Sequence, residues 1–235
     1  MLFRSDAKEL AGELSRRLAR IGHSQAQLIP MAQTFPWWVL RGYASSHLPI
    51  LEELSAYEPA NIAWPAITAW GLAETGALDR AADLLHRTEP AAVTAADANY
   101  HWWAVIVGFS GAVDLVGDRK WAEVLYDLAA PYAGHNATLG LATFLGAVDH
   151  WLGVLAGVAG RYTEAARHLE AALARHRDMG SRPMTALTEQ AYGRVLTLRG
   201  EAADAERARG LTASARRTAD ELGLAAIRDR PLPPG

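Results

Sequence analysis

Cysteine is absent from this sequence of 235 residues. The absence excludes disulfide bonds, zinc sites built from thiolates and cysteine nucleophiles, and it is compatible with a reducing compartment, so we expect a cytoplasmic protein. A strong excess of charge is also lacking, because the formal net charge is only −3. This balance provides no field that would attract nucleic-acid phosphates or anionic lipids. We therefore expect no direct contact with nucleic acid and none with a membrane.

Uninterrupted apolar runs are scarce as well. The most apolar segment, residues 138–160, approaches the length of a membrane span, but Asp149 and His150 interrupt it. Charged residues at positions 6, 8 and 9 precede any apolar run, so the start of the sequence does not match a secretory signal peptide. We predict that residues 138–159 form a buried helix of a soluble protein.

Helix-forming residues are abundant. Half of the residues are hydrophobic and 21% are charged, a balance typical of globular proteins. Alanine is frequent, whereas the runs of Val, Ile and Thr that favour strands are few. The composition therefore predicts an all-α fold. Helices are expected near residues 6–21, 24–41, 45–57, 60–75, 78–87, 94–116, 119–130, 138–159, 161–178, 183–199 and 203–222.

Four segments share a pattern in which an alanine follows a glycine by five residues. The glycines are Gly76, Gly117, Gly160 and Gly200, spaced by 41, 43 and 40 residues. A period of this size indicates a solenoid of helix pairs. A glycine after a helix can adopt the left-handed conformation that ends it, and a small alanine lets the next helix pack closely. The alanines are Ala81, Ala122, Ala165 and Ala205.

The repeats predict a solenoid of antiparallel helix hairpins, a tetratricopeptide-like superhelix, that forms a single domain over residues 1–235. Over residues 1–93 the repeats are irregular, because several prolines remove helical hydrogen bonds there. They are well defined over residues 94–222. Residues 223–235 end in "RDRPLPPG" and are expected to form a frayed tail.

The better-defined repeats contain segments with a family resemblance. These are "LYDLAAPYAGHNATLG" from Leu125, "GAVDHWLGVLAGVAGRYTEAARHLEAALARHRDMGSRP" from Gly146, "AYGRVLTLRG" from Ala191 and "DANY" from Asp97. They resemble a tetratricopeptide-like helical region of large actinobacterial regulators. In that family the region follows a STAND-type ATPase module, which is joined to a LuxR-type or antibiotic-regulatory DNA-binding domain or to an adenylate/guanylate cyclase domain.

The sequence departs from that family because the ATPase and output domains are absent. No phosphate-binding GxxxxGK[ST] motif occurs, and too few residues follow Leu222 for a helix-turn-helix that could contact DNA. The resemblance therefore implies only the role of the repeat region. That role is sensing, autoinhibition or partner binding linked to transcriptional regulation or signalling.

Histidine and carboxylate side chains raise the question of a metal site. Glu164 and His168 stand four residues apart on the flank of an apolar stripe, and His176 lies inside the stripe. Such a pair is half of a metal site, and the nearest further ligands are Asp149 and His150 on the preceding helix. We favour a structural interpretation, in which His176 is hydrogen-bonded at a hairpin interface and Glu164 and His168 form a solvated pair.

A catalytic centre is not indicated. Asp149 and His150 are adjacent, so on a helix their side chains point about 100° apart and do not face each other as a catalytic dyad. No serine lies in a GxSxG motif. We therefore predict no enzymatic activity, no bound metal and no cofactor.

Tryptophan is in excess, with eight residues. Two of them are adjacent at positions 37–38 and two at 102–103, so one of each pair should pack between repeats while the other lines the concave surface of the solenoid. The expected exposed groove of polar and aromatic side chains contains Asn99, His101, Trp103, His135 and Asn136. Asp149, His150, His168 and Arg182 complete the predicted partner-binding residues.

The sequence is compatible with two functions. The leading one is a non-enzymatic interaction or regulatory module whose concave surface binds a protein, a peptide or a small effector. The alternative is a small-molecule or metal-binding enzyme or sensor with a pocket between helices, in which Asp149, His150 or His168 takes part. Apolar residues near the ends of the solenoid could also pair with a second copy to form a homodimer.

Overall fold

The computed structural model describes residues 12–13, 16–17, 20, 28–58, 60–95, 101–139 and 143–230. This part of the chain is mostly helical, which confirms the all-α class, and a small two-stranded sheet is the exception. The α-helices are α2 (Leu28–Leu40), α3 (Ala44–Tyr57), α4 (Ala63–Glu74), α5 (Leu78–Arg87), α6 (Pro90–Ala95), α7 (Trp102–Val116), α8 (Arg119–Ala129), α9 (Val148–Val158), α10 (Tyr162–Asp178), α11 (Arg182–Arg199), α12 (Ala205–Leu222) and α13 (Ala225–Arg228). Two 3₁₀ turns, η2 (Ala130–Tyr132) and η3 (Ala202–Asp204), complete the helical elements.

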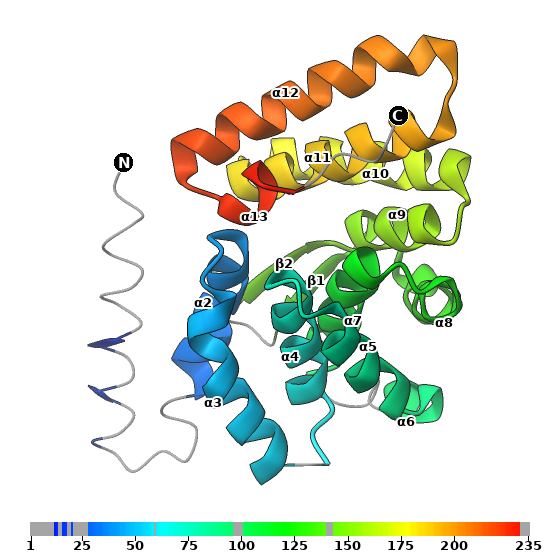
Figure 1. The fold of residues 1–235 in the computed structure, drawn as a ribbon. Coiled ribbons are helices and arrows are strands. Elements are labelled where there is room, and N and C mark those ends of the chain that lie inside the picture. The colour runs from blue at the N-terminus through cyan, green and yellow to red at the C-terminus, as the bar shows by residue number, and fades with distance from the viewer. Residues whose placement is uncertain are drawn as a thin grey trace.

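Successive helices lie side by side. Figure 1 shows α12, α11, α10 and α9 in order from the top of the molecule, with α7 and α4 below them. Contacts follow this order, because α9 packs on α10, α10 on α11, and α11 on α12, while α4 packs on α7 and α5. The short α13 lies between α12 and α2. No helix within the described ranges has both the length and the apolar character needed to cross a membrane.

The repeat glycines adopt the predicted left-handed turns. The φ angles of Gly76, Gly117, Gly160 and Gly200 are 84°, 79°, 83° and 73°. This conformation is open to glycine because it has no Cβ to collide with the following carbonyl. At the end of α7, the Gly117 N–H donates to Val113 O and closes the helix. The sequence therefore located these helix ends correctly.

The repeat alanines follow the prediction in three of four cases. Ala81, Ala122 and Ala165 are completely buried. Ala165 lies under α9, where a Cβ on Gly153 would approach Ala165 O to 3.1 Å. Ala205 is exposed, because it begins α12 beside an open groove between α11 and α12. The packing prediction is therefore wrong at Ala205.

Glycine also permits the close approach of α4 and α7. A Cβ on Gly108 would lie 2.7 Å from the backbone carbon of Ala66, and a Cβ on Gly111 would lie 2.5 Å from the Trp70 ring. Both distances are shorter than a carbon contact allows, so larger residues would separate the helices. This contact belongs to the main hydrophobic core, which continues through α9 and α10.

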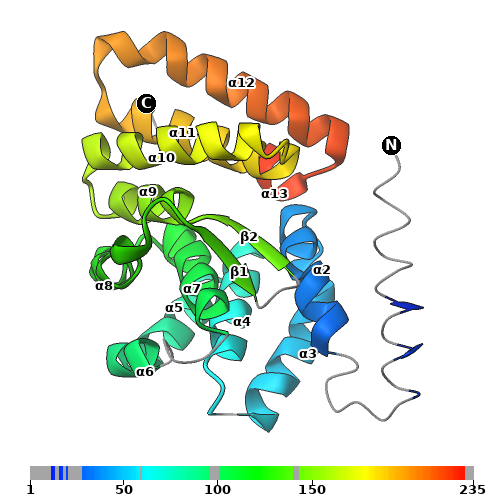
Figure 2. The same ribbon diagram turned by 180° about the vertical axis from the view of Figure 1, so that it is seen from behind.

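The predicted helix over residues 138–159 is wrong at residues 138–139 and 143–147. Strands β1 (Asn136–Leu139) and β2 (Thr143–Ala147) pair antiparallel there, and the helix begins only at Val148. Gly146 has a φ of 105°, which no helical residue adopts, and Thr138, Thr143 and Phe144 favour strands. Figure 2 shows the hairpin crossing the molecule from α9 toward α2. The predicted helix over 94–116 is wrong at its start, because residues 94–95 belong to α6 and α7 begins at Trp102.

The predicted frayed tail is ordered as far as it is described. Residues 225–228 form α13, and Leu224 and Ile227 are 0% and 2% exposed. They pack in a second apolar cluster with Leu40 and Met184. The segment therefore docks back onto earlier helices because it has apolar side chains to bury, which the prolines after it obscure in the sequence. Residues 231–235 lie outside the described part.

Candidate functional site

The predicted groove around α7 is an aromatic cluster in the structure. Trp103 is half-buried, and its ring centroid lies 4.6 Å from that of Trp102 and 5.5 Å from that of Tyr132. His101 and Asn136 are half-buried, whereas His135 is exposed. The expectation that all these side chains are exposed is therefore wrong, because the aromatic rings pack on one another. Asn99 lies outside the described residues.

The structure joins two predicted site residues in a buried group that we call the histidine network, made of Tyr126, Asp149, Glu164 and His168. His168 Nδ1 lies 2.8 Å from Asp149 Oδ1, and Asp149 Oδ2 accepts a hydrogen bond of 2.7 Å from the Gly134 N–H. The Tyr126 hydroxyl lies 3.0 Å from His168 Nε2 and donates to Glu164 Oε1 at 2.6 Å. Helices α8, α9 and α10 each contribute to the network.

The protonation states of the histidine network follow from its contacts. Burial by itself raises the pKa of Asp149, but the hydrogen bonds from His168 and Gly134 outweigh it and lower the pKa below its usual range. An ionised carboxylate only accepts hydrogen bonds, so His168 Nδ1 carries a proton. Burial and the bond to Glu164 raise the pKa of Tyr126 to about 12, so the phenol stays protonated.

The network corrects the prediction of a solvated Glu164–His168 pair. His168 is only 3% exposed, and Glu164 contacts the Tyr126 hydroxyl that also lies beside His168. Tyr126 went unrecognised in the sequence, although its position on the helix before α9 placed it within reach. Arg167 and Tyr126 both lie within hydrogen-bonding distance of His168 Nε2. Within the described ranges, no group of three or more His, Cys, Asp or Glu side chains could hold a metal ion.

His150 points to a different group from its neighbour Asp149, as the helix geometry predicts. Its Nδ1 lies 3.0 Å from the Thr188 hydroxyl, which lies 3.0 Å from His176 Nδ1. His176 Nε2 accepts a hydrogen bond from the Ala147 N–H, which confirms the predicted structural role of this residue. Burial lowers the pKa of His150 to about 3 and that of His176 to about 4. Both rings are therefore neutral near pH 7.

A second charged group, absent from the predictions, lies between α4, α7 and α11. We call it the ionic cluster, and it comprises Glu74, Asp114, Arg194 and Arg230. Asp114 accepts from Arg194 and, at 2.7 Å, from Arg230 Nη1, while the other terminal nitrogen of Arg230 donates to Glu74. The side chains of Glu74, Asp114 and Arg230 are each 8% exposed. The sequence signal for this cluster is a single acidic residue in each of two apolar helices, Glu74 in α4 and Asp114 in α7.

The electrostatics of the ionic cluster differ between its two carboxylates. Burial raises the pKa of Glu74, and the attraction of Arg230 only partly opposes this effect. Burial also acts on Asp114, but Arg194 and Arg230 outweigh it and lower the pKa. Asp114 is therefore the better stabilised anion, because it contacts two guanidinium groups and Glu74 contacts one.

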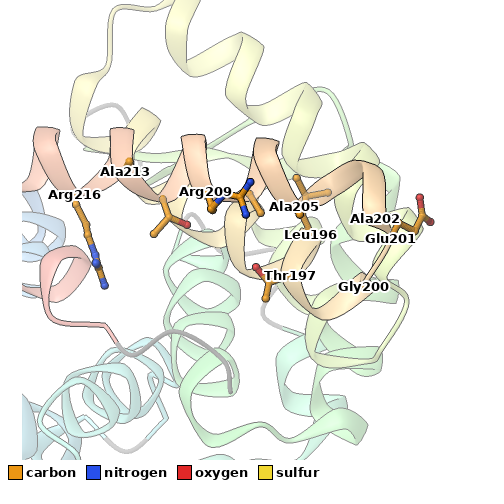
Figure 3. Close-up of a pocket in the computed structure, with 11 residues that line it drawn as sticks. Leu196, Thr197, Gly200, Glu201, Ala202, Ala205, Arg209, Ala213 and Arg216 are labelled. Atoms are coloured by element: carbon orange, nitrogen blue, oxygen red, sulfur yellow. The ribbon is translucent and has the colours of Figure 1, made fainter. Parts of the chain in front are cut away.

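An open groove of about 590 Å³ lies between α11 and α12. Its floor is made of small or apolar side chains, including Leu196, Thr197, Ala208 and Ala213. Figure 3 shows Arg216 at one end of the groove, Glu201 at the other and Arg209 between them. Another groove, of about 750 Å³, runs between α3, α4 and α5 and has charges of both signs.

Arg182, the last predicted partner-binding residue, is exposed at the start of α11 and pairs with the exposed Glu221. It lines neither of the two grooves.

Comparisons of the chain with protein-family models, with curated proteins and with solved structures found no match.

Proposed function

We propose that the chain is a non-enzymatic helical-repeat module, a solenoid of helix hairpins, that binds a protein partner in the α11–α12 groove. The solenoid is supported by the left-handed glycines at 40- to 43-residue intervals and by the side-by-side packing of successive helices. Within the described residues, α12 packs mainly on α11 and on the short α13. The groove would then be the face on which another helix packs.

The observation that carries the proposal is an apolar floor flanked by two available arginines. Neither Arg209 nor Arg216 forms an ion pair with another residue of the described chain. They are seven positions apart on α12, which places them about 10 Å apart on one face. The matching partner is an amphipathic helix with small apolar residues on one face and two acidic residues about two turns apart.

A regulatory role is supported by the resemblance of the repeats to those of actinobacterial regulators. On that basis the partner belongs to transcriptional regulation or signalling, and the repeat module would contact it without touching DNA. The alternative of a metal-binding or small-molecule enzyme gains no support from the histidine network, whose His168 is enclosed by Asp149, Tyr126 and Arg167.

Site-specific cross-linking tests the groove. A photoreactive residue at Ala213, inside the groove, should capture a partner from a lysate of the source cells, whereas the same residue at Arg217, exposed on α12 but outside the groove, should not. With the purified partner, Arg209→Glu combined with Arg216→Glu should weaken binding about tenfold or more, and Arg217→Glu should have little effect.

Two results would count against the groove. One is a partner whose affinity is the same for the double variant and the wild type, and the other is equal capture from positions 213 and 217. A cross-link to a second copy, together with a dimer mass in light scattering, would identify the groove as a homodimer interface instead.

A further inference from the structure

Residues 224–230 bind the rest of the chain as a short peptide would. Leu224, Ile227 and Arg230 are buried at three-residue intervals, while Arg228 between them is exposed. Leu224 and Ile227 enter the apolar cluster that contains Met184, and Arg230 enters the ionic cluster. Apolar anchors beside a charged anchor are typical of peptide recognition, in which a few buried side chains give most of the affinity.

The receptor for Arg230 is built by other parts of the chain. Arg230 Nη1 donates to Asp114 on α7 at 2.7 Å, and its other terminal nitrogen donates to Glu74 on α4. The Trp70 indole donates to the same Glu74 oxygen at 3.0 Å and holds that carboxylate in place. The planar guanidinium therefore bridges two carboxylates from different helices, a geometry that an ammonium group does not reproduce.

The charge balance of the ionic cluster requires a second cation. Without Arg230, Asp114 keeps Arg194, and Glu74 has no cation in contact among the residues that the structure describes. Leaving a carboxylate buried without a partner is costly, so the vacated position favours another cation.

We propose that Glu74 and Asp114 form an arginine-recognition site, which Arg230 fills within the chain and which also takes the arginine of a peptide partner. The peptide carries two apolar residues and an arginine at three-residue intervals, like Leu224, Ile227 and Arg230. The segment that exchange would displace is short, because α13 has only four residues and follows the left-handed Gly223. The site is separate from the α11–α12 groove, and either can exist without the other.

Chemical rescue in the full chain tests the site directly. The variant Arg230→Ala should be less stable than wild type, and millimolar methylguanidinium should raise its melting temperature by about 2 to 4 °C. Methylammonium, which has the same charge but lacks the planar donors, should not. Arg228→Ala, which removes an exposed arginine of the same segment, should gain nothing from either cation. Equal effects of both cations on Arg230→Ala would overturn the proposal.

A peptide experiment tests exchange with a partner. The probe is a synthetic peptide of residues 223–230, and the receptor is the full chain carrying Ile227→Asp and Arg230→Ala, which weaken the internal segment. The peptide should bind at least about tenfold more tightly than the same peptide with Arg230→Gln. Equal affinities, or no binding to a receptor whose circular dichroism shows it to be folded, would overturn the proposal. If the double variant does not fold, displacement of the internal segment in the single variant Arg230→Ala gives the same comparison.

Discussion

The histidine network and the ionic cluster, two buried polar groups, are assembled over different distances along the chain. The histidine network joins residues 19 to 42 positions apart, all from neighbouring helices. The ionic cluster joins residues 80 to 156 positions apart. The first therefore stabilises contacts between adjacent helices, while the second links α4 and α7 to α11 and to the segment after α13. The spacing of the repeats predicts contacts between adjacent helices, but it does not predict contacts between helices that are far apart in the sequence.

Breaking the ionic cluster should have the largest effect on stability. Asp114→Asn removes the carboxylate that contacts both Arg194 and Arg230, so that Glu74 is the one carboxylate of the ionic cluster left beside its two guanidinium groups. We expect the free energy of unfolding to fall by about 3 to 5 kcal/mol, measured by urea denaturation. Glu52→Gln, in an exposed ion pair with Arg80, is the matched control and should cost far less. If both variants lost the same free energy of unfolding, the buried position of the ionic cluster would contribute nothing to stability.

Breaking the histidine network should have a smaller effect, because its members retain other partners. His168→Leu leaves Asp149 with the Gly134 N–H alone, and we expect a loss of about 1 to 3 kcal/mol. Tyr126→Phe removes only one hydroxyl and should cost about 1 kcal/mol. Thermal unfolding of both variants measures the ranking, and the reverse order would show that the tyrosine, rather than the Asp149–His168 pair, holds the network together.

Acid should weaken the protein through the buried histidines His150 and His176, which both contact Thr188. The pKa values of His150 and His176 are lowered to about 3 and about 4 from 6.5, so below pH 6.5 the unfolded chain binds more protons than the folded one. Their contribution is fully present above pH 6.5 and declines by about 1.4 kcal/mol per pH unit for each histidine as the pH falls toward the folded values.

Replacing one histidine should reduce this dependence on pH. In His176→Asn, the loss of stability between pH 7 and pH 5 should be smaller than in wild type by about 2 kcal/mol. Urea denaturation at both pH values measures this difference in the free energy of unfolding. The stability lost by His176→Asn at pH 7, where the histidine is neutral, is the control for changed packing. If the loss of stability between pH 7 and pH 5 were the same in the variant and the wild type, folding would not lower the pKa of His176.

The smallest effect is expected at Arg182, which belongs to neither buried group. Its ion pair with Glu221 is exposed to solvent, where such pairs contribute little. Arg182→Ala should change the free energy of unfolding by no more than about 0.5 kcal/mol. A loss as large as that of His168→Leu would contradict the contrast between buried and exposed charges.

Local patterns in the sequence predicted much of the fold. The period of the glycines located the helix ends at Gly117 and Gly200, since a left-handed turn depends on one residue and its neighbours. The β-hairpin was missed because the apolar run around Leu145 suits a buried helix and a buried strand equally well. Periodicity alone does not separate the two.

The candidate sites were less predictable for a physical reason. Asp149 and His168 were both singled out, and their stacking followed from the repeat, but the tyrosine that completes the network carries no special sequence signal. Arg230 sits in a proline-rich stretch that indicates a loop, and its partners are more than 100 residues away. Long-range pairs of this kind depend on the path of the whole chain, which a pattern of 40 residues does not specify.

The contact between Glu74 and Arg230 also has a consequence for the order of folding. It closes a loop of 156 residues, and the entropy lost in closing a loop grows with its length. Helix pairs such as α9 and α10 are sequence neighbours and meet quickly, whereas this contact forms only after the intervening helices are in place. Until then, among the described residues, Glu74 lacks a counterion and Asp114 has only Arg194. We therefore expect the docking of Arg230 to come late in folding and to provide the second positive charge of the ionic cluster.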